Sequence, residues 1–358
     1  MKIAFRVDAS DTIGSGHLMR CLTLASTLQK KAVSSTFIVQ KCLGNQIDLI
    51  RGKGFQVHEI QQITKQAITT NNDKPHVKKY NWEFDSSQTS KILNNLKPSW
   101  LVVDHYALDS RWEGNQKKYV KKIMVIDDLA NREHDSDILL DQNLYPNAGN
   151  RYEQMVSKKC KKLLGIKYAL LQPEYNELRS QVKISDSKIK NIFMYFGNTE
   201  ANNIIIRIMN IFIGLNRKDI KLNIVLPDNS GQKEIITERL KLHPNIILFG
   251  QQKSLASLIL EADLAVGGGG ATTWERLCLG LPSVVITVAD NQRECANYVS
   301  KLGLINLIGD ITSINDETIK KELEILLNKP NLTNWSKRCF DYFDGNGAAR
   351  VADMLVNS

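Results

Sequence analysis

The stretch Gly14-Ser-Gly-His17, with the residues on either side of it, decides the fold class of this chain. A short apolar run, Ile3–Val7, predicts a strand before it, and Leu18–Leu28 carries apolar residues at helical spacing after it. A glycine-rich turn between a strand and a helix is how α/β folds bring backbone N–H groups to a phosphate. The start of the chain therefore predicts an α/β fold with an anion-binding turn, in which Gly14 and Gly16 contact the ligand.

His17 places a titratable imidazole at the N-terminus of the predicted helix. The positive end of the helix dipole disfavours the imidazolium, so we expect a neutral ring that can take a proton from water. A histidine that only caps the helix or fills a polar niche is the structural alternative. The flanking glycines favour the catalytic interpretation.

The composition allows two ordinary domains and excludes several classes of protein. The chain has 358 residues, of which 42% are apolar and 24% charged, which excludes collagen-like and disordered chains. The net charge is +9, but the lysines are scattered in short runs without interleaved aromatic residues. We therefore expect no nucleic-acid partner, and a mild positive field that favours an anionic small substrate.

The sequence also carries signals about the compartment. The apolar run at the start is broken by Arg6 and Asp8, so it is no secretory signal, and no apolar run approaches the roughly 18 residues that span a bilayer. The six cysteines form no Cys-x-x-Cys pair and are typical of buried thiols in a reducing compartment. We expect a cytoplasmic protein with no membrane partner, as a monomer or weak dimer.

Strand-like and helix-like segments alternate along the whole chain, which predicts parallel sheets with crossover helices. The predicted strands are 3–7, 35–39, 56–60, 100–103, 122–126, 138–140, 191–196, 222–226, 246–249, 264–266 and 283–288. The polar segment between Leu171 and Lys188 predicts a domain boundary. We expect an N-terminal domain over 1–175, a second over 188–338 and a C-terminal helix over 339–358. Both domains are predicted to be doubly wound and to face each other across a cleft, with ligands at the carboxyl ends of the strands.

A second glycine-rich turn, Gly267-Gly-Gly-Gly270, joins a predicted strand to a predicted helix. Its exposed amides and the helix dipole favour a diphosphate, and Glu275 is placed to accept hydrogen bonds from ribose hydroxyls. The pattern is neither the dinucleotide-binding fingerprint nor a P-loop. A plain packing turn is the alternative. Beyond the next strand, Asn291 is a weaker candidate, because polar residues at strand ends meet ligands in such folds.

A third strand ends in Asp104-His-Tyr106, where Tyr106 could hold a water or a sugar hydroxyl. His105 is as easily a structural residue. The acidic residues near Asp127 and His134 raise the possibility of a metal site, but loop-capping carboxylates explain them better, because no metal-ligand spacing is present. We therefore predict no metal and no other cofactor.

Taken together and in order, these segments resemble the UDP-sugar hydrolase family of pseudaminic acid biosynthesis. That family is related to nucleotide-sugar glycosyltransferases of the GT-B fold, of the MurG type. The matching segments are 6–10, 13–21, 103–106, 126–130, 137–143, 168–171, 270–275 and 291–292. The resemblance implies an α/β, GT-B-like fold with two doubly wound Rossmann-type domains.

The resemblance also implies a reaction, the metal-independent inverting hydrolysis of UDP-2,4-diacetamido-2,4,6-trideoxy-β-L-altropyranose to UDP and the free sugar. The resemblance places this reaction in the biosynthesis of pseudaminic acid, a nonulosonic acid, for flagellin or surface glycans. By resemblance, His17 is the catalytic base and Tyr106 lies near the attacked carbon. The residues that would bind substrate are Gly14, Gly16, Gln172, Asn203, Gly269, Gly270, Thr272, Glu275 and Asn291.

Two departures from the family pattern bear on the identity of the substrate. This chain has Gly197-Asn-Thr-Glu200 where the family has Gly-Gly-Thr-Asp, and Gln172 where the family has arginine. Either departure could change phosphate or sugar contacts. A GT-B glycosyltransferase with a sugar or lipid acceptor, and a non-catalytic nucleotide-sugar-binding module, remain as alternatives.

Overall fold

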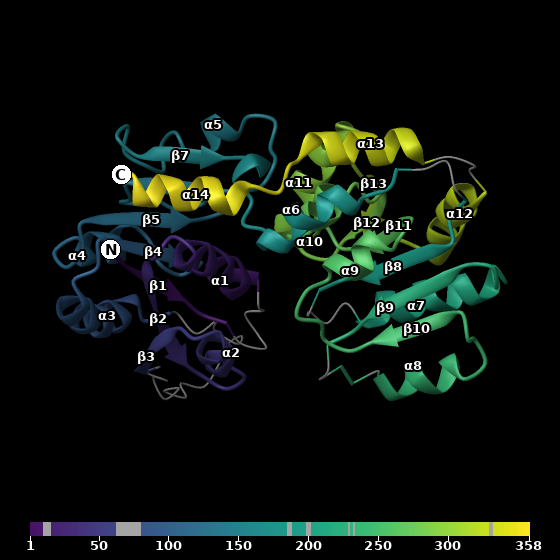
Figure 1. The fold of residues 1–358 in the computed structure, drawn as a ribbon, viewed down its shortest axis with the longest axis horizontal. Helices are drawn as coiled ribbons and strands as arrows, with labels where there is room; N and C mark the ends of the chain where they lie inside the picture. Colours follow the sequence, from purple (N-terminus) through teal and green to yellow (C-terminus); the bar gives the residue numbers. More distant parts are fainter. Residues whose placement is uncertain are drawn as a thin grey trace, which may run out of the picture. The chain divides into compact units, whose positions relative to one another are not determined.

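The computed structural model describes residues 1–9, 16–61, 80–184, 188–197, 202–227, 230–231, 233–328 and 332–358. It divides the chain into two compact units. Unit 1 comprises Met1–Gln142, Asn147–Leu164 and Ala348–Ser358, and unit 2 comprises Asn143–Pro146 and Gly165–Gly347. Both ends of the chain therefore belong to unit 1 (Figure 1).

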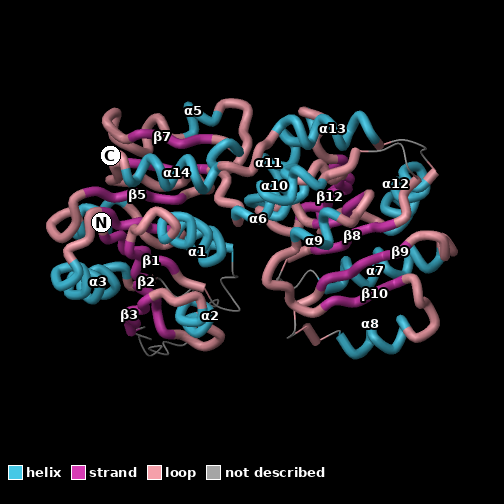
Figure 2. The backbone as a smooth tube through the Cα atoms, viewed as in Figure 1, coloured by secondary structure: helices cyan, strands magenta, loops and turns pink. Residues whose placement is uncertain are grey.

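Unit 1 is built on a parallel sheet of seven strands in the order β3-β2-β1-β4-β5-β6-β7. The strands are β1 (Lys2–Val7), β2 (Ser34–Lys41), β3 (Gln56–Gln61), β4 (Trp100–Asp104), β5 (Lys122–Ile126), β6 (Ile138–Asp141) and β7 (Lys161–Leu164). The helices are α1 (Gly16–Gln29), α2 (Ile47–Gly52), α3 (Trp82–Leu96), α4 (Ser110–Gln116), α5 (Ala148–Arg151) and α14 (Gly347–Val356). Figure 2 shows the strands at the centre of the unit, with helices around them.

Unit 2 repeats the plan with six parallel strands in the order β10-β9-β8-β11-β12-β13. The strands are β8 (Asn191–Tyr195), β9 (Lys221–Val225), β10 (Ile246–Phe249), β11 (Leu264–Gly267), β12 (Ser283–Thr287) and β13 (Asn306–Asp310). The helices are α6 (Pro173–Leu178), α7 (Asn202–Gly214), α8 (Lys233–Leu240), α9 (Ala256–Leu260), α10 (Thr272–Cys278), α11 (Asp290–Lys301), α12 (Asp316–Leu327) and α13 (Thr333–Tyr342), with 3₁₀ turns at Ile166–Tyr168 and Arg179–Gln181.

The central strands are apolar on both faces, as parallel sheets covered by helices require. All five residues of β4 are buried, and so are all five of β12. The two strand orders reverse direction beside β1 and β8, so β1 and β4 are neighbours in one sheet and β8 and β11 in the other. Doubly wound sheets bind ligands at such a switch point, outside the carboxyl ends of the strands. The predicted α/β class of two doubly wound units is confirmed.

The eleven predicted strands are all present, and two further strands, β7 and β13, complete the sheets at one edge each. β7 begins with two exposed lysines, Lys161 and Lys162, and every residue of β13 is only half-buried. Edge strands need fewer apolar residues than central ones, so neither segment has a strong hydrophobic pattern.

The structure divides the chain at other residues than the sequence suggests. Residues 165–175, expected in the N-terminal domain, belong to unit 2. The helix α6, which begins at Pro173, packs against α9 and α10 of unit 2. Asn176 of this helix donates to the carbonyl of Asp344, and Arg179 just after it donates to those of Cys278 and Phe343. The chain beyond Gly347, expected as a separate helix, belongs to unit 1, where Asp353 forms an ion pair with Lys31.

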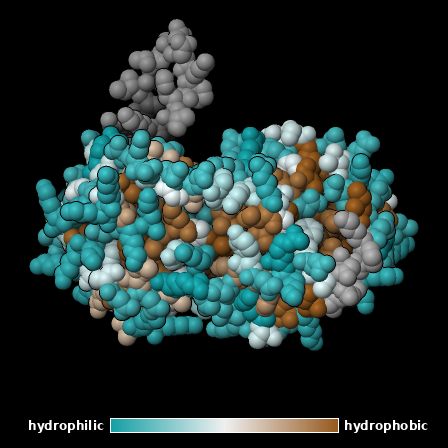
Figure 3. All heavy atoms as spheres, turned by 90° about the horizontal axis from the view of Figure 1, so that it is seen from above, coloured by the Kyte–Doolittle hydropathy of each residue, from teal (hydrophilic) through white to brown (hydrophobic). Residues whose placement is uncertain are grey.

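Two surface properties follow from the side chains. Hydrophilic residues dominate the face drawn in Figure 3, which agrees with lysines scattered over the chain. Among the described residues, no helix combines the length and the apolar character that crossing a membrane demands.

All six cysteines lie in the described ranges and none forms a disulfide; five are buried and Cys42 is partly exposed.

Candidate active site

The switch point of unit 1 gathers the polar residues that the sequence singles out. Val7 of β1 is the register partner of Asp104, the last residue of β4. His17 is the second residue of α1, the helix that follows β1, and Tyr106 lies just beyond β4. Because the carboxyl ends of parallel neighbours meet at one edge of the sheet, these side chains converge there.

His17 is hydrogen-bonded to a buried carboxylate. Its Nδ1 lies 2.5 Å from Asp104 Oδ1, and its side chain is 10% exposed while that of Asp104 is fully buried. Arg20, one turn further along α1, binds the same carboxylate through Nε at 2.6 Å. Burial alone would raise the pKa of Asp104, but the charges of Arg20 and His17 outweigh burial and hold this pKa well below its usual range. Asp104 is therefore ionised.

Tyr106 packs against His17 and is tied to a second carboxylate. The two rings are in T-shaped contact with centroids 4.4 Å apart, and the Tyr106 hydroxyl donates to Asp128 Oδ1 at 2.8 Å. Burial and the Asp128 charge raise the pKa of Tyr106 well above its usual value. The hydroxyl therefore stays protonated at neutral pH and is suited to hydrogen bonding.

A separate ion cluster holds the turn that carries Tyr106. Arg6 lies between Asp8 and Asp85, with Nη1 2.5 Å from Asp8 and Nη2 2.5 Å from Asp85. His105 places its Nε2 3.1 Å from Asp8, and its Nδ1 accepts a hydrogen bond from the backbone N–H of Ala107. Both ring nitrogens are thus engaged with the protein, and His105 takes the structural role.

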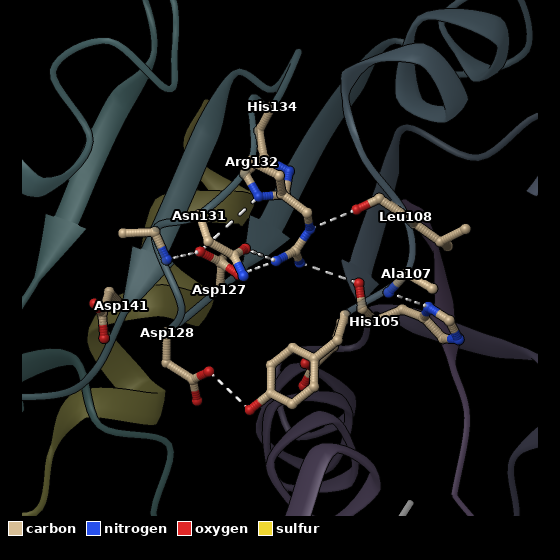
Figure 4. Close-up of polar contacts among 12 residues, drawn as sticks. His105, Ala107, Leu108, Asp127, Asp128, Asn131, Arg132, His134 and Asp141 are labelled. Atoms are coloured by element: carbon tan, nitrogen blue, oxygen red, sulfur yellow. Dashed lines mark hydrogen bonds and ion pairs between the residues drawn. The ribbon is translucent and has the colours of Figure 1, made fainter. Parts of the chain in front are cut away.

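The consecutive residues Asp127 and Asp128 point in different directions (Figure 4). Asp127 is buried, pairs with Arg132 at 2.9 Å and caps the turn at Ala130, whereas Asp128 reaches the Tyr106 hydroxyl. His134 is held by Glu113 at 2.7 Å. Asp127 and Glu113 thus make structural contacts, and in the described part of the chain no cluster of His, Cys, Asp and Glu is arranged to hold a metal ion.

The glycine turn of unit 2 follows β11 and leads into α10. One side chain, Gln292 of α11, accepts through Oε1 from the backbone N–H groups of Gly269 and Val288, each at 3.1 Å. The Gly268 carbonyl accepts a hydrogen bond from Arg276 Nη2 at 2.8 Å. Side chains thus fix the turn from two sides.

Gly267 is the position of this glycine run at which packing excludes a side chain. A Cβ there would lie 2.3 Å from Arg276 Nη1 and 2.5 Å from the Tyr195 carbonyl, whereas a Cβ at Gly268 would meet only ordinary contacts, the nearest at 3.8 Å. We expect Gly267→Ala to lower the free energy of unfolding by about 1–3 kcal/mol, because overpacked sites must shift the backbone. The matched control Gly268→Ala is expected to change it by much less. Chemical denaturation of both variants measures the difference, and equal stabilities would contradict this explanation.

Glu275 has an unusual environment in the first turn of α10. Its Oε2 is buried without a hydrogen-bond partner, while Tyr175 of α6 donates a hydrogen bond to its carboxylate. Burial raises the pKa of Glu275 to about 7, against the opposing effects of Tyr175 and the Arg276 charge. A buried acceptor without a donor is costly in the free protein, and a ligand hydroxyl would satisfy it.

The structure places the other predicted substrate-binding residues as follows. Gln172 precedes α6, the helix that carries Tyr175, and so belongs to unit 2 with Glu275. Gly269, Gly270, Thr272 and Asn291 lie along the glycine turn and at the starts of α10 and α11. Gly16 begins α1, and a Cβ there would meet nothing within 4 Å. Gly14 lies outside the described residues, as do residues 198–200, and the side chain of Asn203 is likewise not described.

Sequence reasoning missed the residues that surround these candidates. Arg20, Asp104 and Asp128 contact the predicted pair in unit 1, and Tyr175 and Gln292 contact the predicted groups in unit 2. Arg20 had a visible signal, because it follows His17 at helical spacing and shares its face. The others come from distant parts of the chain, and only the sheet order brings them close.

Comparisons with known proteins agree with this architecture. The chain superposes on the crystal structure of MurG from Acinetobacter baumannii over 100% of this chain and 99% of MurG, with a TM-score of 0.66 at 15% identity. Residues 192–352 match the family model of the glycosyltransferase family 28 C-terminal domain. The matched residues lie mostly in unit 2, which is thus similar to domains of this class, and the chain has the GT-B fold.

Two relatives extend the likeness to most of the chain. One is UDP-2,4-diacetamido-2,4,6-trideoxy-β-L-altropyranose hydrolase of Campylobacter jejuni, 26% identical over 85% of this chain and 97% of the relative. The other is an uncharacterized protein of Methanocaldococcus jannaschii, 24% identical over 86% of this chain. The matched region spans only 60% of the length of that relative. The chain is a homologue of the Campylobacter hydrolase, as the sequence motifs indicated.

Proposed function

We propose that this protein is an enzyme that hydrolyses a UDP-linked 2,4-diacetamido-2,4,6-trideoxy sugar to UDP and the free sugar, in the biosynthesis of a nonulosonic acid. The observation that carries the proposal is His17, which is held by the ionised Asp104 at the ligand-binding edge of the sheet in unit 1. The name of the Campylobacter relative supports both the substrate class and the use of water as the acceptor.

The proposed reaction needs one base and one nucleotide-binding site. His17 Nε2 takes a proton from water, the water oxygen bonds to the anomeric carbon, and the bond from that carbon to the diphosphate oxygen breaks. The bonding electrons leave with UDP, whose terminal phosphate has a pKa of roughly 6, by analogy with phosphorylated side chains, so no strong general acid is needed. Attack opposite the leaving group inverts the anomeric centre.

Unit 2 is proposed to bind the nucleotide. Glu275 supplies a buried carboxylate oxygen without a partner for the ribose hydroxyls. Backbone N–H groups where the glycine turn leads into α10 are assigned to the diphosphate; the Gly269 N–H is not among them, because it already donates to Gln292. Gln172, Gly270, Thr272 and Asn291 are the further side chains and amides that we assign to substrate binding there. Tyr106 is assigned to hold the attacking water or a sugar hydroxyl in unit 1.

A GT-B glycosyltransferase is the second candidate, because the family 28 domain in residues 192–352 is named for glycosyl transfer. The discriminating experiment incubates the purified protein with several UDP-diacetamido sugars, with and without sugar or lipid acceptors. Hydrolysis predicts UDP release at the same rate with water alone, and ¹H NMR of the first product should show the inverted anomer. UDP release that requires an acceptor would replace the hydrolase by the transferase.

The same assay tests the independence from metal ions. We expect UDP release to continue unchanged in excess EDTA, because the charge that develops on the diphosphate is assigned to backbone amides and not to a cation. A loss of turnover in EDTA that Mg²⁺ or Mn²⁺ restores would contradict this part of the proposal.

A further inference from the structure

Asp104 collects hydrogen-bond donors from three side chains of α1. His17 Nδ1 lies 2.5 Å from its Oδ1, Arg20 Nη2 lies 2.6 Å from the same oxygen, and Arg20 Nε lies 2.6 Å from Oδ2. The Cys21 thiol is 3.6 Å from Oδ2. Asp104 is only 1% exposed, so its carboxylate interacts with these groups in place of bulk water.

These contacts determine which nitrogen of His17 carries the proton in the neutral ring. An ionised carboxylate only accepts, so a contact of 2.5 Å between Asp104 Oδ1 and His17 Nδ1 requires a hydrogen on Nδ1. Arg20 Nη2 lies 3.1 Å from the same nitrogen, but its contact with Asp104 Oδ1 is shorter, at 2.6 Å, and a lone pair on Nδ1 would face the acceptor oxygen of Asp104 at 2.5 Å. The lone pair of the neutral imidazole is therefore on Nε2.

The network continues to the second candidate residue of the site. Arg20 Nη1 lies 3.1 Å from Asp128 Oδ2, and the other oxygen of Asp128 accepts from the Tyr106 hydroxyl at 2.8 Å. The rings of Tyr106 and His17 are in T-shaped contact, with their centroids 4.4 Å apart. One guanidinium thus joins two carboxylates, each of which orients one of the two side chains.

We propose that Asp104 and Arg20 are positioning residues for the His17 base. Asp104 fixes the Nδ1–H tautomer and the ring plane, and Arg20 keeps Asp104 ionised while linking it to Asp128 and Tyr106. When Nε2 takes the proton from water, the imidazolium forms next to a carboxylate that is already charged, so the protein need not reorganise. This inference deepens the proposed function and depends on His17 acting as the base.

The direct test is ¹⁵N NMR of the histidine side chains at neutral or higher pH. The chain has six histidines, and the His17 signals are those missing from the His17→Leu spectrum. In the unmodified protein we expect the Nδ1–H tautomer, and a His17 ring protonated on Nε2 when neutral would overturn the inference without any variant of Asp104.

Asp104→Asn adds the functional readout. Its amide can donate to Nδ1, so we expect the tautomer to shift towards Nε2–H, with kcat reduced about 10²- to 10³-fold and KM changed less than about twofold. Asp128→Asn is expected to leave the tautomer in place. An unchanged tautomer and unchanged kcat in Asp104→Asn would reject the positioning role.

Asp8→Asn is the matched control, because Asp8 is equally buried at the end of the neighbouring strand and pairs with Arg6 and His105. We expect it to lower Tm without altering the His17 tautomer. If Asp104→Asn lowered only Tm, as this control does, the contact between Asp104 and His17 would be purely structural. Failure of the hydrolase proposal is recognised separately: the unmodified protein then releases no UDP from UDP-diacetamido sugars in water alone, whatever the tautomer.

Discussion

His17→Leu should abolish hydrolysis while the protein stays folded and still binds UDP. Removing a general base costs roughly 10²- to 10⁴-fold in rate, and leucine has no group that can take a proton from water. The fold should survive because Asp104 keeps two hydrogen bonds from Arg20, so its buried charge remains compensated. The measurement is UDP release under saturating substrate, with UDP binding by calorimetry and circular dichroism on the same sample.

The control is His58→Leu, which removes a partly buried histidine from β3 of the same unit. This variant should release UDP at the rate of the unmodified protein. If His17→Leu also retained that rate, the general-base assignment would be abandoned. UDP binding without any UDP release by the unmodified protein is the result that would favour a binding module.

The fold could be predicted in outline because its signals are local. Apolar runs such as Trp100–Val103 and helical spacing such as Leu18–Leu28 depend on neighbours in the sequence, and both elements are where the pattern puts them. The strand β7 was missed because lysines begin it at an edge of the sheet. The division near Gly165 was missed because contacts with residues around Phe343 decide it, and these are distant along the chain.

The site was predictable only where one residue carries the signal by itself. His17 stands out beside glycines, and Glu275 stands out after a glycine run. What makes each of them distinctive is contributed by other segments: Asp104 lies at the end of a different strand, and Tyr175 lies on a helix before the second sheet begins. Composition and spacing do not encode such pairings, which depend on the order of strands in each sheet.

Glu275→Gln should make the free protein more stable at pH 8 and weaken its binding of UDP. The folded-state pKa of Glu275 is about 7, above its usual value of 4.5, because burial penalises the carboxylate. The protonated form is favoured in the folded state, so the stability from this group is full below pH 4.5 and is lost as the pH rises through 7. The uncharged glutamine avoids that loss, which amounts to about 3 kcal/mol at pH 8.

Thermal or chemical unfolding at pH 4.5 and pH 8 measures the effect. The gain of Glu275→Gln over the unmodified protein should be largest at pH 8 and close to zero at pH 4.5. Glu317→Gln is the control, since Glu317 is exposed in the first turn of α12, and its effect should be small at both pH values. A gain for Glu275→Gln that does not depend on pH would show that burial of a charge is not its cause.

The functional half of this prediction has the opposite sign. Hydrogen bonds to a charged acceptor contribute roughly 1.5–3 kcal/mol, so losing the carboxylate should raise KM and the Kd for UDP by about 10-fold or more, with kcat little changed. Glu275→Ala should raise KM at least as much. An unchanged KM in both variants would remove Glu275 from the ribose site, whereas stabilisation together with weaker binding would show that this buried charge is kept for the ligand at the expense of the free protein's stability.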